Sequence, residues 1–206
     1  MWEFLELEEH IGRYWHRLVG KADSYPYYPD AAVTLDSIRS SLSVFFRGLG
    51  GAPGIVLAAG TPKSSGHRLK IRQRLGMEQE SMSRIECNAE RMLLPATIAC
   101  FSSAALNRRL YFWLAAYFAV AENSCRDTLR DPLQADLAFL HNAYWISLKV
   151  CDRFPGLTRD YQALCQALFE QRPQRFLSEQ EQAVEAVIQT LLGKPYSNAG
   201  SEALLQ

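Results

Sequence analysis

The sequence lacks the residue spacings that mark the commonest metal and nucleotide sites. Its 5 cysteines form no Cys-x-x-Cys pair, and its 4 histidines include no His-Glu-x-x-His motif. The glycine-rich stretch Gly48-Leu49-Gly50-Gly51 lacks the Gly-Lys-Ser/Thr ending of a phosphate-binding loop. It follows a predicted helix, which favours a helix end. The sequence therefore predicts no catalytic residue, no metal site and no cofactor in this chain.

An excess of charge of one sign is also missing, because 22 basic side chains balance 22 acidic ones. This balance argues against nucleic acid or an anionic membrane as the general partner. The longest apolar run, Leu110 to Ala121, has 12 residues, whereas a membrane-spanning helix needs about 20. We expect this run to be a buried helix, and we expect no membrane insertion.

Signals for secretion are missing as well. The sequence begins with acidic and apolar residues, without the basic stretch and cleavage site of a signal peptide. An odd number of widely spaced cysteines does not indicate a disulfide framework. We therefore expect a cytoplasmic location.

Apolar residues recur at helical spacing along most of the chain, in which 48% of the residues are hydrophobic. About six helices are predicted, at residues 2–19, 34–49, 103–121, 131–153, 158–172 and 178–192. Thr34 is the expected N-cap of the second helix. Large apolar residues mark the expected inner face of the fourth helix: Leu133, Leu137, Leu140, Tyr144 and Leu148.

The stretch from residue 54 to residue 101 has a different pattern. Ile55-Val56-Leu57 is a strand candidate, and segments 84–87 and 91–94 predict a β-hairpin that ends at Pro95. For residues 60–83 the pattern leaves both a mobile loop and a short helix open. We predict a mainly α (α+β) single domain over residues 1–195, with a small β-hairpin or sheet inserted after the second helix near 54–101. Residues 196–206 are predicted to be a linker.

A basic segment lies within this insert and contains no acidic residue between its first and last members. Its five basic residues are Lys63, Arg68, Lys70, Arg72 and Arg74. A solvated loop is the simplest interpretation, and a docking surface for an acidic partner is the alternative. Nucleic acid is less favoured, because no aromatic residue lies within the segment to stack on bases.

Four short segments match one protein family in the same order. They are Trp-His-Arg-Leu-Val-Gly at 15–20, Tyr-Pro-Asp-Ala-Ala-Val at 28–33, Val-Phe-Phe-Arg-Gly-Leu-Gly-Gly at 44–51, and Leu-Asn-Arg-Arg-Leu-Tyr-Phe-Trp-Leu-Ala-Ala at 106–116. Together they resemble the N-terminal helical region of the CbbO/NorD family. Their prominent residues are expected to be architectural, with the arginines in ion pairs to early glutamates: Trp15, Arg17, Tyr28, Phe45, Phe46, Arg47, Asn107, Arg108 and Trp113.

This resemblance implies a function. Family members look like two-part adaptors, in which this region precedes a von Willebrand factor A domain and works beside a MoxR-type AAA+ ATPase, CbbQ or NorQ. The implied role is a non-catalytic bacterial adaptor that couples the ATPase ring to its client. Rubisco, freed of inhibitory sugar phosphates, is the favoured client, and nitric oxide reductase is the alternative.

The resemblance also implies where cofactors would lie. The Asp-x-Ser-x-Ser cation motif of the von Willebrand factor A domain does not occur in this sequence. ATP and magnesium would therefore belong to the partner ATPase, and a divalent cation to the von Willebrand factor A domain.

Two other classes of function stay open. One is a small stand-alone enzyme whose site would use His141 with Asp136 or Cys125, although helical spacing does not place Asp136 and His141 on one face. The other is a nucleic-acid-binding domain that uses the basic segment, for which binding would weaken steeply with salt.

Overall fold

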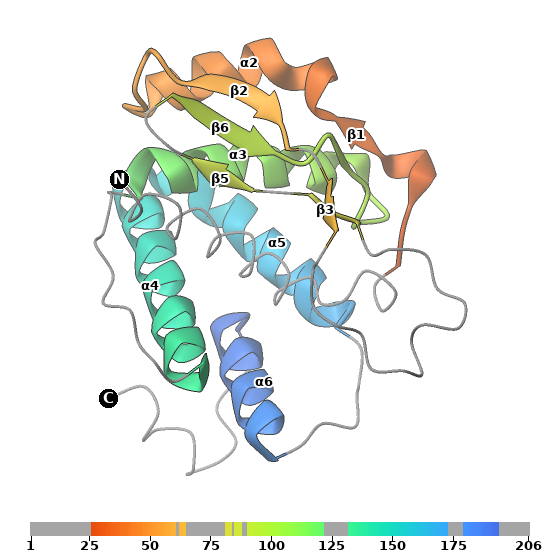
Figure 1. Cartoon of the computed structure of the whole chain (residues 1–206), viewed down its shortest axis with the longest axis vertical. Coiled ribbons are helices and arrows are strands. Elements are labelled where there is room, and N and C mark those ends of the chain that lie inside the picture. Colours follow the sequence, from red (N-terminus) through yellow and green to blue (C-terminus); the bar gives the residue numbers. More distant parts are fainter. Residues whose placement is uncertain are drawn as a thin grey trace.

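The computed structural model describes residues 26–60, 62–64, 81–83, 85–87, 90–121, 132–172 and 179–193. Within these residues the chain is mainly helical, with a small β region beside the second helix, and this confirms the predicted α+β class (Figure 1). The predicted helix at 2–19, with Trp15 and Arg17, lies outside the described residues. So does the predicted linker at 196–206.

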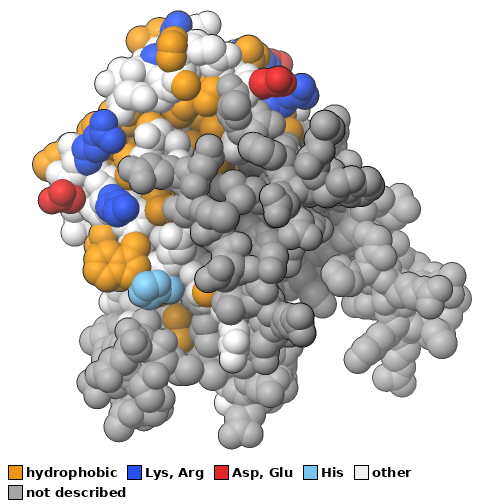
Figure 2. Space-filling model, turned by 60° about the vertical axis from the view of Figure 1, so that its left-hand side comes forward, with side chains coloured by type: hydrophobic (Ala, Val, Ile, Leu, Met, Phe, Trp, Pro, Cys, Tyr) orange, Lys and Arg blue, Asp and Glu red, His pale blue; other side chains and the backbone are white. Residues whose placement is uncertain are grey.

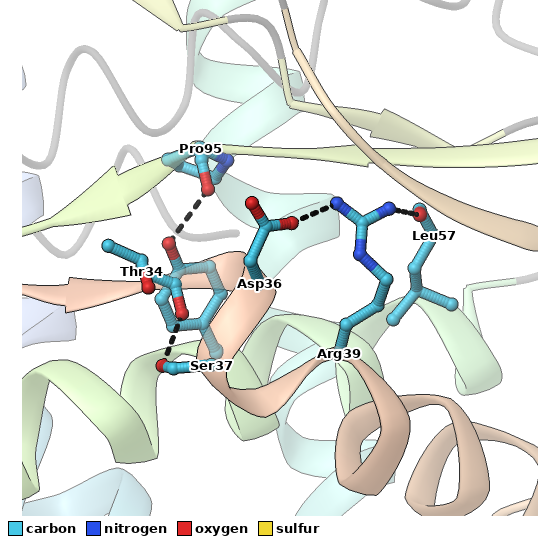
Figure 3. Close-up of polar contacts among 7 residues, drawn as sticks. Thr34, Asp36, Ser37, Arg39, Leu57 and Pro95 are labelled. Carbon is cyan, nitrogen blue, oxygen red and sulfur yellow. Dashed lines mark hydrogen bonds and ion pairs between the residues drawn. The ribbon is translucent and has the colours of Figure 1, made fainter.

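The N-terminal part of the described chain is a short 3-10 helix, η3 (Pro29–Ala31), followed by strand β1 (Val33–Thr34) and helix α2 (Leu35–Gly48). Helix α2 forms because apolar residues recur every three or four positions and become buried on one side. Thr34 occupies the predicted N-cap position, but its side chain makes no capping hydrogen bond. Instead, the Ser37 hydroxyl donates to the Thr34 carbonyl at 2.7 Å (Figure 3).

The β region contains one three-stranded sheet and two strand pairs. Strand β6 (Arg91–Leu94) lies between β2 (Val56–Ala59), which is parallel to it, and β5 (Glu86–Cys87), which is antiparallel. The antiparallel β5–β6 pair confirms the predicted hairpin. Strand β1 pairs with β7 (Thr97–Ile98), and β3 (Pro62–Ser64) pairs with β4 (Ser81–Ser83). The two ends of the undecided stretch 60–83 are therefore paired strands.

Arg39 joins helix α2 to the sheet. Its guanidinium donates through Nη1 to the Leu57 carbonyl of β2 at 2.7 Å, and it also pairs with Asp36 on the first turn of α2 (Figure 3). Strand β2 is an edge strand of its sheet, and an unpaired edge is open to pairing with other chains. The contact from Arg39 occupies one outward carbonyl of this edge.

Helix α3 (Ala104–Val120) is the centre of the domain, and nine of its residues are buried. It packs against α2, α4 (Pro132–Arg153) and α5 (Thr158–Glu170). Trp113 stacks on Tyr161 of α5 with ring centroids 4.4 Å apart. The apolar run at 110–121 is thus the buried helix that the sequence predicts, up to its end at Val120.

The predicted inner face of α4 is wrong at Leu148, whose side chain is 37% exposed. The buried face instead follows Leu140, Ala143, Ser147 and Val150. The small residues let α4 approach its neighbours closely, and the Ser147 hydroxyl is satisfied by donating to the Ala143 carbonyl at 2.9 Å. The prediction considered only large apolar residues and overlooked the small ones, so the predicted buried face of α4 is rotated about the helix axis relative to the observed one.

The last described helix, α6 (Glu179–Leu191), packs on α4. It is joined to the end of α5 by a two-bond ion pair between Arg172 and Glu185, with distances of 2.5 and 2.7 Å. The Arg172 side chain is almost fully buried, so the pair fixes the position of α6 more strongly than an exposed pair would.

Candidate interaction surfaces

Asn107 lies at the point where three segments of the chain meet. Its amide nitrogen donates to the carbonyls of Ala31 at 2.8 Å and Phe101 at 2.9 Å, and its amide oxygen accepts from the Phe101 N–H at 2.9 Å. The side chain is fully buried. Because the polar groups of a buried amide need partners, this arrangement fixes the segments before α2 and before α3 on one helix.

Tyr111, one turn further along α3, makes a second link of the same kind. Its hydroxyl donates to the Pro95 carbonyl at 2.7 Å, just after β6. Burial raises the pKa of this phenol far above its usual value, with further contributions from Cys100 and Asp36. The hydroxyl therefore stays protonated and keeps donating over the whole physiological range.

The two last glycines of segment 44–51 are required by the turn after α2. Gly50 has φ +95°, a conformation that side chains rarely adopt. A Cβ added to Gly51 would lie 2.4 Å from the ring of Phe46, which is buried. Gly48 differs, since nothing lies within 4 Å of its Cβ position.

Among the described residues of the family segments, the aromatic side chains of α2 and α3 pack between helices, whereas Arg47 and Arg108 are exposed. Phe45 meets Phe112 edge to face at 4.9 Å, and Arg108 lies over the Phe112 ring at 5.6 Å. Arg47 donates to the Ser43 carbonyl of its own helix at 3.3 Å. Neither Arg47 nor Arg108 forms an ion pair with a described carboxylate, and the early glutamates lie outside the described residues.

The other predicted residues are placed as follows. Tyr28 is half-buried, and its backbone N–H donates to the Ala99 carbonyl at 2.8 Å. Lys63 lies in β3, where its backbone is in register with Met82. The remaining four residues of the basic segment lie outside the described residues, so its role as a docking surface stays a prediction.

His141 of α4 does not face a described carboxylate. It is exposed, and its Nε2 accepts a hydrogen bond from Nε1 of Trp145 at 2.8 Å. The side chain of Asp136 and all of Cys125 lie outside what the structure describes. Among the described residues, no group of three histidine, cysteine or acidic side chains is arranged to hold a metal ion.

The sequence prediction missed the exposed aromatic face of α4. Trp145 is 50% exposed, and Leu148 lies one turn further along the same face. Figure 2 shows hydrophobic atoms beside the histidine on this side of the molecule, with Lys or Arg side chains close by. If Ala143 and Ser147 are taken as the centre of the buried face, helical spacing places Trp145 and Leu148 on the solvent-exposed face.

The described cysteines are free thiols that are half-buried. Burial raises the pKa of Cys87 and Cys165 to about 11 and that of Cys100 to about 12. A thiol must lose its proton to become a strong nucleophile. These thiols therefore stay protonated at neutral pH.

None of the described helices is both long enough and apolar enough to cross a membrane. The structure thus defines a mainly helical α+β domain centred on α3. No family model and no solved structure matches the chain.

Proteins named NorD do match the chain. It is 43% identical to Protein NorD of Brucella abortus over 93% of its length, and 31% identical to Protein NorD of Stutzerimonas stutzeri over 94%. An uncharacterised protein of Pseudomonas aeruginosa is 35% identical over 82% of the chain. These relatives support the CbbO/NorD family for this chain, but they do not support the preference for CbbO. The chain spans only 30% of the length of the NorD relatives.

Proposed function

We propose that this chain is a domain of a NorD-like adaptor that takes part in the activation of nitric oxide reductase. The observation that carries the proposal is the 43% identity to a NorD protein over 93% of the chain. A Rubisco client has no comparable support, since each named relative is a NorD protein. Nitric oxide reductase therefore replaces Rubisco as the proposed client.

The proposed mechanism is mechanical coupling rather than catalysis. The family resemblance implies that the adaptor docks on a MoxR-type AAA+ ATPase ring of the NorQ kind and passes its movements to the client. A rigid scaffold suits this role, because a coupling domain must move as one body. The Asn107 hydrogen bonds and the buried ion pair between Arg172 and Glu185 are the kind of internal contacts that provide such rigidity.

Binding to the ATPase is the first test of this mechanism. The purified chain is mixed with the cognate MoxR-type ATPase at low salt with nucleotide present, and the mass of the complex is measured by light scattering while ATP turnover is followed in parallel. We expect a stable complex and altered turnover. Absence of a complex under these conditions would contradict the proposed coupling to the ATPase.

The client is tested separately in cells that make the protein. Removing this domain from its gene is expected to abolish nitric oxide consumption, although the reductase subunits are still made at normal levels. Rubisco activation, where the cell has it, is the matched control and is expected not to change. The reverse pattern would favour the Rubisco alternative.

A further inference from the structure

We draw no further inference here: the strongest candidate, the exposed surface patch on the outer face of α4 around His141, Trp145 and Leu148, is an unpartnered apolar face, and nothing in the described part of the structure shows what covers it.

Discussion

Replacing Asn107 by alanine removes three short hydrogen bonds between α3 and residues 31 and 101, together with a longer one from the Cys100 thiol at 3.6 Å. The three bonds have lengths of 2.8–2.9 Å, and the side chain is fully buried. The change leaves the Phe101 N–H and the carbonyls of Ala31 and Phe101 without these partners. A buried polar group that loses its partner costs about 1–3 kcal/mol. Three such groups together cost at least about 3 kcal/mol, and single substitutions rarely cost more than about 5 kcal/mol, so we expect the free energy of unfolding to fall by about 3–5 kcal/mol.

This loss is large for a domain whose total stability is about 5–15 kcal/mol. Urea unfolding followed by circular dichroism measures it, provided that the slope of the transition is unchanged. Asn107→Asp is expected to cost a similar amount. The carboxylate keeps an acceptor for the Phe101 N–H, but its second oxygen replaces the amide donor and is repelled by the carbonyl oxygens of Ala31 and Phe101. Asn142→Ala is the matched control, because Asn142 makes no side-chain hydrogen bond within the described part of the chain. It is expected to change stability by less than about 0.5 kcal/mol. A loss below about 1 kcal/mol for Asn107→Ala would refute the reasoning.

Two further predictions concern packing and pH. Gly51→Ala is expected to lower the free energy of unfolding by about 1–3 kcal/mol, because its Cβ would overlap the buried Phe46 ring. Gly48→Ala is the control, and it is expected to be neutral or to stabilise the protein by up to about 1 kcal/mol. Equal effects of the two substitutions in urea unfolding would contradict this prediction. Burial raises the pKa of Cys100 to about 12 and that of Cys165 to about 11, from 9.0. The stability that comes from keeping these thiols neutral is thus complete below pH 9.0 and lost as pH rises through about 11 to 12. Melting temperature should fall over that window, and thiolate absorbance appearing near pH 9.0 in the folded protein would show that the thiols are not shielded.

Much of the fold could be predicted because its signals are local. The turn glycines, the helix breaks and the apolar periodicity of α2 and α5 each depend on residues close together in the chain. The hairpin of β5 and β6 was also predictable, because its strands are separated by a short turn. The parallel pairing of β2 with β6 was not predicted, since it joins strands more than thirty positions apart and no local pattern encodes it.

The candidate surface was harder to predict than the fold. Leu148 lies on the exposed face of α4. Because leucine is apolar, the sequence pattern assigned it to the buried face instead. The observed phase of α4 is set by the close packing of Ala143 and Ser147, which a search for large apolar residues does not weigh. The hydrogen bond between Trp145 and His141 requires a defined rotamer for each side chain, and spacing shows only that they can meet.

The most direct test of the proposed function is the rate of nitric oxide consumption in cells that carry the full gene with this domain deleted. The NorD-like proposal predicts that consumption is lost although the reductase subunits are present, and that a second copy of the intact gene restores it. Consumption at the wild-type rate in the deleted cells would contradict the proposal.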